Sequence, residues 1–267
     1  MINKAKRYGS IFLALVIILM TFSSCNSNKE EVDDTREDTP AKVSLTAGVG
    51  RKTSEPISPT RNSYTICIDP GHGFVDGGCG EGIFDDGILE KDVTLAIAKC
   101  LERELQSLGY STVLTHDGTT IPANADSNGN RIFSAAERAE YVNKLDIDYF
   151  VSIHVNAFDS DTSVSGVQIY YEQNANKSNT WSEEIARDIS DAIQTTVPNV
   201  SRVSLKDGAD YSLAVTRQTK AAASLIEVGF CTNPNDAANM ADPEWQTAFA
   251  KAVAAGIDEF FGGASTK

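Results

Sequence analysis

The chain has 267 residues, with 23 basic and 37 acidic side chains, a formal net charge of −14 at pH 7 and 41% hydrophobic residues. So acidic a protein repels nucleic acid and anionic membrane surfaces, and we expect neither as a binding partner. The length and the apolar fraction suffice for one domain with a sizeable core.

The first 24 residues are predicted to be a secretory signal. Lys4, Lys6 and Arg7 precede an apolar run at 11–22, an order typical of signal peptides. A spanning helix needs about 20 apolar residues, so a plain membrane anchor is the less favoured alternative. Residues 23–25, Ser-Ser-Cys, resemble the lipobox of bacterial lipoproteins. This resemblance implies cleavage before Cys25, lipidation of Cys25, and a lipid anchor in a bacterial membrane that faces the cell wall.

Residues 25–62 are predicted to be the lipidated cysteine followed by a disordered tether. The segment is polar and contains almost no large apolar residue, so it cannot bury enough surface to offset the entropy of ordering. Its sequence at 27–31, SNKEE, resembles acidic sorting signals that send some lipoproteins to the outer cell surface. We therefore expect a periplasmic location, with the outer cell surface as the alternative.

From residue 63 to 267 the composition is that of a globular domain. The periodicity predicts strands at 64–69, 110–116, 148–156, 166–172 and 222–230, and helices at 90–108, 134–145, 181–197 and 243–261. Gly109 is expected to end the first helix, whose apolar positions recur at helical spacing from Val93 to Leu108. Alternating strands and helices indicate an α/β fold: a single-domain three-layer sandwich with a largely parallel, mixed sheet and helices on both faces.

Functional side chains gather at the carboxyl ends of strands in such sheets. His72 lies between Gly71 and Gly73 just after the first strand, and His154 lies near the end of the third. Glu90 opens the first helix, where it could simply compensate the helix dipole. Glu227 sits between apolar neighbours in a strand, where a carboxylate costs several kcal/mol unless it is paired or metal-bound; Arg217 and Lys220 are the candidate pairing cations.

Taken together, these imidazoles and carboxylates predict a metal site. Two histidines and one carboxylate form a ligand set for catalytic zinc that leaves a fourth position for water. The metal brings the pKa of that water towards neutrality, and the remaining glutamate can then accept and return a proton. Glycines on both sides of His72 allow the backbone to approach the ion closely.

Five blocks of the sequence carry a family resemblance. They are IDPGHG, the helix beginning LEKDVTLA, ERAEYVNKLDIDYFVSIHVNA, SGVQIYY and SLIEVGFCTNPND, and they span 66–236 in order. The domain resembles the zinc-dependent N-acetylmuramoyl-L-alanine amidases of the amidase_3 type, which cleave peptidoglycan between the lactyl group of N-acetylmuramic acid and L-alanine. The resemblance implies one zinc ion, with His72, Glu90 and His154 as metal ligands and Glu227 as the catalytic residue. Asn156 and Arg217 are our candidates for substrate binding.

The sequence departs from that family at a few positions. His116 follows the second strand where the family commonly has arginine; we interpret His116 as a surface or substrate-edge residue and not as a fourth metal ligand. Between Tyr171 and Trp181 there is room for only a short polar loop, which predicts that the long blocking helix of some relatives is absent. We expect a monomer.

Other functions compatible with these residues are a carboxypeptidase or sugar deacetylase that uses zinc, a non-catalytic wall-binding lipoprotein, and a phosphate-binding loop at GHGFVDGG. Of the remaining cysteines, Cys67 and Cys100 are predicted to be inert. Cys79 and Cys231 follow strands in loops, and the sequence leaves open whether they form a disulfide.

Overall fold

The computed structural model describes residues 61–79, 88–120, 133–172 and 181–263. The predicted signal, the lipidation site Cys25 and nearly all of the predicted tether therefore lie outside the described residues, as do 173–180, where the absence of a blocking helix is expected. None of the helices in the described ranges is long and apolar enough to cross a membrane.

The described elements alternate along the chain much as the periodicity predicts. In order they are η1 (Arg61–Ser63), β1 (Thr65–Pro70), α1 (Glu90–Leu108), β2 (Ser111–Leu114), α2 (Ala135–Val142), β3 (Tyr149–Asn156), β4 (Val167–Tyr171), α3 (Trp181–Thr196), β5 (Val203–Asp207), η2 (Gly208–Asp210), α4 (Ala214–Gln218), β6 (Ala222–Phe230), α5 (Pro234–Ala241) and α6 (Pro243–Gly263). The strand β5 and the short helices α4 and α5 are additions to the sequence prediction.

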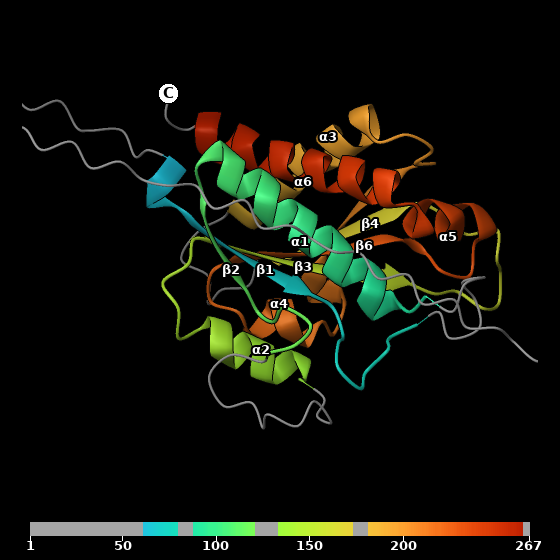
Figure 1. Ribbon diagram of the computed structural model, residues 1–267, viewed down its shortest axis with the longest axis horizontal. Helices are drawn as coiled ribbons and strands as arrows, with labels where there is room; N and C mark the ends of the chain where they lie inside the picture. The colour runs from blue at the N-terminus through green and yellow to red at the C-terminus, as the bar shows by residue number, and fades with distance from the viewer. Residues whose placement is uncertain (1–60, 80–87, 121–132, 173–180, 264–267) are drawn as a thin grey trace, which may run out of the picture. The chain divides into compact units, whose positions relative to one another are not determined.

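The strands form one sheet in the order β2-β1-β3-β6-β4-β5. All neighbouring pairs are parallel except β4 and β6, which are antiparallel. Helices α1, α3 and α6 cover one face of this sheet, and α2 and α4 lie on the other face (Figure 1). The predicted three-layer α/β sandwich with a mixed, largely parallel sheet is confirmed.

Helix α1 begins and ends where local chemistry favours it. The Asp92 carboxylate accepts the Leu89 backbone N–H at 3.1 Å, and Gly109 ends the helix with φ 96°, as predicted. Most of its apolar stripe is buried against the sheet and α6, but Leu108, in the last turn, is 37% exposed and does not belong to the core. The helix thus fixes Glu90, its first residue, at the carboxyl edge of the sheet.

A buried ion pair between Asp69 and Arg138 supports the carboxyl edge of the sheet. Asp69, at the end of β1, is fully buried, and Arg138 of α2 contacts its Oδ1 atom at 3.0 Å. Ser152 Oγ also donates to Asp69, at 2.6 Å. Burial alone would raise the pKa of Asp69, but the Arg138 guanidinium and the hydroxyl donors outweigh it, and the pKa is lowered. Arg138 also donates to the carbonyls of Pro70 and His72, and so connects α2 to the loop after β1.

We expect Arg138→Met to destabilise the protein by about 3–5 kcal/mol, because it leaves the Asp69 charge buried without its partner. Urea unfolding measures this change. Arg187→Met, which removes an exposed i,i+4 pair with Glu183 on α3, is the matched control and should cause no comparable loss. Equal stability of the wild-type and Arg138→Met proteins would show that the ion pair does not support β1.

Candidate metal centre

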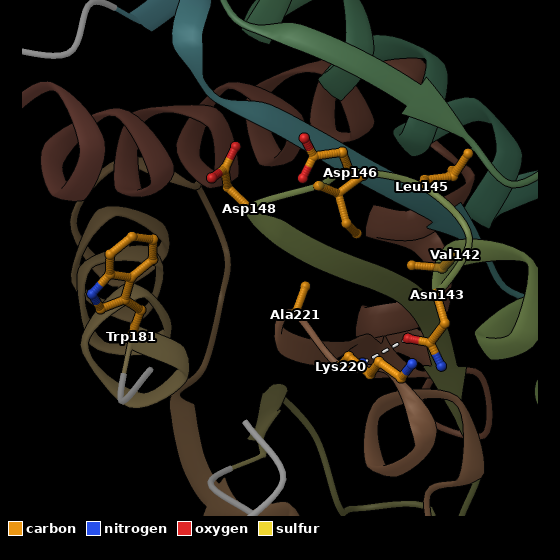
Figure 2. Close-up of a pocket in the computed structure, with 9 residues that line it drawn as sticks. Val142, Asn143, Leu145, Asp146, Asp148, Trp181, Lys220 and Ala221 are labelled. Carbon is orange, nitrogen blue, oxygen red and sulfur yellow. Dashed lines mark hydrogen bonds between the residues drawn. The ribbon is translucent and has the colours of Figure 1, made fainter. Parts of the chain in front are cut away.

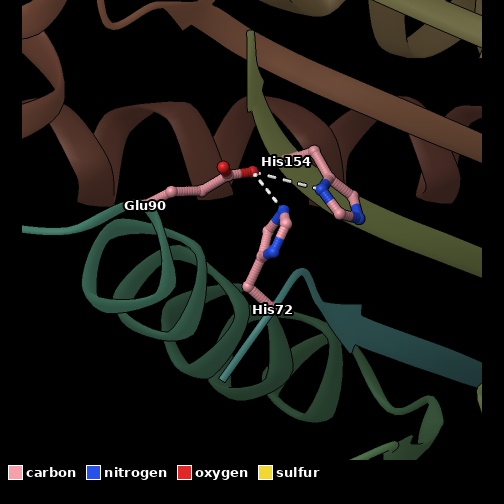
Figure 3. Close-up of side chains that lie close together, drawn as sticks. All are labelled: His72, Glu90 and His154. Carbon is pink, nitrogen blue, oxygen red and sulfur yellow. Dashed lines mark hydrogen bonds and ion pairs between the residues drawn. The ribbon is translucent and has the colours of Figure 1, made fainter. Parts of the chain in front are cut away.

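Three side chains that are distant in sequence meet at the carboxyl edge of the sheet. His72 comes from the loop after β1, Glu90 from the first turn of α1, and His154 from the end of β3 (Figure 3). Glu90 Oε1 lies 3.2 Å from His72 Nε2 and 3.1 Å from His154 Nδ1. The ligand atoms of the three residues all lie within 4.8 Å of one another. The structure therefore brings together the three residues that we predicted as metal ligands.

The loop after β1 is shaped to present His72. His72 itself has φ 60°, a left-handed conformation that is uncommon for a residue with a side chain. Gly71 packs so closely on β3 that a Cβ atom there would lie 2.6 Å from the His154 ring and 2.6 Å from the Ile153 carbonyl oxygen. Glycine at position 71 is therefore required for the two imidazoles to share one site.

The Glu90 carboxylate is held by backbone donors as well as by imidazoles. Oε1 accepts the Val155 N–H at 2.8 Å, and Oε2 accepts the Cys79 N–H at 2.7 Å. Glu90 is 2% exposed, and burial alone would raise the pKa of its carboxyl group. Hydrogen bonds and charge from His154 and His72 outweigh this effect and lower the pKa of Glu90. An anionic carboxylate is thus fixed in place at the centre of the cluster.

The geometry of this cluster fits one small divalent cation. Bonds of about 2.0–2.1 Å in a tetrahedral site place neighbouring ligand atoms roughly 3.3 Å apart, close to the two separations around Glu90 Oε1. Two imidazoles and one carboxylate also match the donor preference of zinc. Asp76 Oδ2 lies 3.0 Å from His72 Nδ1, as expected of a carboxylate that orients a metal-binding histidine through its other ring nitrogen.

Protons compete with a cation at this site. Burial alone would lower the pKa of His72, but Glu90 and Asp76 together raise it to about 9. Metal binding requires neutral imidazole, so the cation must displace a proton at neutral pH. The affinity of the site for a metal should therefore strengthen as the pH rises towards 9.

Glu227 lies beside the cluster but is not part of the ligand group. It is directly opposite both His154 of β3 and Gln168 of β4 in the sheet. Its Oε2 atom is buried and has no hydrogen-bond partner among the described residues. Burial, opposed in part by His154 and reinforced by the Glu90 charge, raises the pKa of Glu227 to about 7. A buried carboxyl group with an unused oxygen and a near-neutral pKa is suited to proton transfer.

The two candidate substrate-binding residues lie in different surroundings. Asn156, two residues beyond His154, donates from Nδ2 to Gln168 Oε1 at 3.1 Å, so it extends the polar row that contains Glu227. Arg217 is exposed on α4 and donates from Nη1 to Ser212 Oγ at 3.1 Å. The structure brings Asn156 to the edge of the cluster and places Arg217 on α4.

His116 does not lie at the surface, and the prediction of a surface or substrate-edge residue is wrong. It is 1% exposed, and its Nε2 atom is 2.9 Å from the Pro70 carbonyl oxygen. Its ring packs 5.2 Å from that of Phe74, centroid to centroid. The imidazole lies against the loop that carries His72, so closely that a Cβ atom at Gly73 would be 2.8 Å from the ring. It is absent from the ligand group.

Three residues that support the site were not predicted from the sequence: Asp76, Arg138 and Gln168. Asp76 has a local signal, because a carboxylate four residues after a candidate ligand can reach back to it across a glycine-rich turn. Arg138 and Gln168 act across the fold, from α2 and from β4, so no local pattern marks them. Their roles depend on strand order and on the antiparallel register of β4 with β6.

The structure also contains a pocket at the opposite end of the sheet (Figure 2). It is lined by residues at the amino ends of β3 and β6, among them Asp146, Asp148 and Lys220, and by Trp181. Asp148 accepts the Thr65 N–H, and the Lys220 N–H donates to Asn143 Oδ1. These polar groups thus form hydrogen bonds between segments at the amino ends of the strands. The pocket is separate from the histidine cluster.

The fold and the site together define an α/β protein with a candidate divalent-cation site at the carboxyl edge of its sheet. The family model for N-acetylmuramoyl-L-alanine amidase, Amidase_3, matches residues 66–259. This chain belongs to that family of cell-wall amidases.

Individual relatives agree with this assignment. Over 210 residues the chain is 29% identical to the germination-specific N-acetylmuramoyl-L-alanine amidase of Bacillus subtilis (strain 168), a match that covers 78% of this chain and 84% of that protein. The N-acetylmuramoyl-L-alanine amidase structure from Clostridium difficile 630 superimposes with a TM-score of 0.62 at 26% identity, over 75% of this chain and 98% of that one. The CwlD amidase from Clostridioides difficile, solved in complex with the GerS lipoprotein, gives a TM-score of 0.60 at 26% identity, over 75% and 99%.

The three histidines of the chain provide a controlled test of metal binding. We expect the wild-type protein to bind one equivalent of Zn²⁺, and His72→Ala to lose at least ~100-fold in affinity, because a lost ligand should cost more than a lost outer partner. His116→Ala is the control and should bind within a few-fold of wild type. Competition with a chromogenic chelator measures all three affinities. Full zinc affinity in His72→Ala would contradict the assignment.

Proposed function

We propose that this protein hydrolyses the amide bond between the lactyl group of N-acetylmuramic acid and L-alanine in peptidoglycan, and that it uses one zinc ion held by His72, Glu90 and His154. Family membership supports the reaction. The observation that carries the zinc assignment is the cluster itself, in which both imidazoles meet one buried carboxylate oxygen. Peptidoglycan is the proposed partner in this reaction.

When bound, zinc supplies a Lewis acid for the amide carbonyl and lowers the pKa of a bound water. The residues of the chain provide the proton transfers and the positioning. Glu227 accepts a proton from the attacking water and then donates it to the nitrogen of the leaving L-alanine. Its pKa of about 7 lets it hold that proton between the two steps at neutral pH. Glu90 serves as a ligand and not as the base, because both of its oxygens are engaged.

Asn156 and Arg217 are the proposed substrate contacts. Asn156 donates to Gln168, which is directly opposite Glu227 in the sheet, and we propose that its amide contacts the substrate near the scissile bond. Arg217, which is exposed on α4, offers a cation for an acidic wall fragment. Because the chain is acidic overall, a local cation of this kind would matter for an anionic substrate.

We further propose that residues 1–24 are removed as a signal, that Cys25 carries the lipid anchor, and that a tether up to residue 62 connects it to the catalytic domain at 63–267. This arrangement would hold an exported enzyme within reach of the cell wall. The positive n-region, the short apolar run and the Ser-Ser-Cys sequence support the proposal.

Replacement of Glu227 by glutamine tests the mechanism. We expect Glu227→Gln to keep its zinc and to lose about 10²–10⁴-fold in turnover, because the amide cannot transfer the proton. Glu140→Gln, an exposed change on α2 beside Lys144, is the matched control and should be fully active. Mass analysis of the digested wall should show glycan freed of peptide and intact stem peptides that begin with L-alanine.

Other products would point to other functions. Shortened stem peptides would indicate a carboxypeptidase, deacetylated sugars would indicate a deacetylase, and undigested but bound wall would indicate a binding protein. Each of these results would contradict the proposed amidase activity, as would full turnover by Glu227→Gln.

The N-terminal arrangement has a separate test. Mass spectrometry of the protein extracted from membranes should find an N-terminal peptide that begins at Cys25 and carries acyl chains, because the signal is cleaved at the modified cysteine. Cys25→Ser should give a protein without lipid. An intact chain that begins at Met1, or an unmodified Cys25, would contradict the lipid anchor.

A further inference from the structure

Two cysteines that are far apart in sequence, Cys79 and Cys231, lie near the histidine cluster. Cys79 follows the glycine-rich loop that carries His72, and Cys231 follows β6, the strand that carries Glu227. The Cys231 N–H donates to the Asn156 carbonyl oxygen at 2.8 Å. Cys79 Sγ lies 3.9 Å from that same oxygen and 3.5 Å from the Val155 carbonyl oxygen. Both residues therefore pack on the same turn of backbone at the end of β3.

The side chain of Cys79 and the backbone of Cys231 approach the same atom. Cys79 Sγ lies 3.9 Å from the Asn156 carbonyl oxygen and the Cys231 N–H donates to it at 2.8 Å, and both cysteines are free thiols in the structure. The other two cysteines in the described part of the chain have different neighbours: Cys67 is buried within β1, and Cys100 on α1 lies near Thr247 of α6. A disulfide needs two cysteines whose backbones lie close together, and two cysteines far apart in sequence that pack on one carbonyl group are candidates for such a bond.

We propose that Cys79 and Cys231 form a disulfide in the exported protein, and that this bond ties the loop of His72 to the end of β6. The inference does not depend on the amidase reaction. It depends on the packing of both cysteines against the Asn156 carbonyl group and on the proposed export to an oxidising compartment, where such bonds persist.

Exposure of the two residues sets the order of bond formation. Cys79 is half-buried, whereas Cys231 is 1% exposed. The Cys79 thiolate attacks a sulfur of an oxidised dithiol protein, which forms a mixed disulfide and releases one thiolate of the oxidant. The Cys231 thiolate then attacks Cys79 Sγ and releases the second thiolate. Two protons and two electrons leave the cysteine pair, and the disulfide of the oxidant is reduced to a dithiol.

The bond would act on the metal centre through the backbone. The Cys79 N–H is the donor to Glu90 Oε2, and the segment from His72 to Cys79 contains the Asp76 carboxylate that contacts His72. A covalent link at Cys79 therefore fixes the carboxyl-terminal end of the segment that orients two of the three proposed ligands. A loop so fixed should unfold later on heating than the same loop with free thiols.

The test uses the full chain, expressed with its own leader and extracted from membranes without reductant. Alkylation under denaturing conditions, followed by proteolysis and mass spectrometry, should yield one peptide pair linked through Cys79 and Cys231. Cys67 and Cys100 should be alkylated. Alkylation of both Cys79 and Cys231 in this unreduced protein would overturn the proposal, as would a different pairing.

Matched variants separate the disulfide from a structural effect of the thiols. Cys100→Ser should keep the linked peptides, and Cys79→Ser should lose them and leave Cys231 open to alkylation. Reductant should lower the midpoint of thermal unfolding of the wild type and of Cys100→Ser, but not that of Cys79→Ser. If reductant lowers the midpoint of Cys79→Ser by as much as that of the wild type, the bond does not stabilise the loop. Because the readouts are thiol content and stability, their failure is distinguishable from a failure of the amidase assignment.

Discussion

A buried carboxylate, Glu90, is the constraint around which this structure is organised. Removal of a carboxylate from water costs several kcal/mol unless its lone pairs are satisfied. Here they are satisfied by the backbone N–H groups of Val155 and Cys79 and by two imidazoles. These partners come from β3 and from the segment after β1, whereas Glu90 belongs to α1, so the site can form only when the central part of the fold is correct. The same requirement leaves one oxygen of Glu90 facing both imidazoles.

Asp69 is a second buried carboxylate, and its role is structural. Asp69 is neutralised by Arg138, and the guanidinium reaches past it to the carbonyls of Pro70 and His72. The unusual backbone conformation of His72 is thereby held on two sides. Arg138 contacts the His72 carbonyl oxygen, and Glu90 and Asp76 contact the His72 ring. Asp69 thus rigidifies the loop, while Glu90 is available to a cation. Glu227, with an unsatisfied oxygen, is the third member of this set and the one suited to chemistry.

Much of this arrangement could be predicted from the sequence, because the relevant residues sit at the ends of strongly patterned strands. His72 and His154 lie at the ends of apolar strands, Glu227 interrupts another, and the carboxyl ends of these strands must share an edge; Glu90 opens the first helix. The fold class followed from the same alternation. The strand β5 could not be found in this way, because its residues are all partly exposed and carry no clear pattern. His116 was misplaced for a related reason: whether it faces solvent depends on contacts with Pro70 and Phe74, which only the closed loop provides.

The central claim is that His72, Glu90 and His154 share one divalent ion. Diffraction from crystals grown with zinc, measured at the zinc absorption edge, tests it most directly. We expect one anomalous peak per chain, within bonding distance of both imidazoles and of Glu90, with Glu227 beside it but not bound. A protein that takes up no zinc at this position, or that binds zinc elsewhere and leaves these three side chains as they are, would contradict the account.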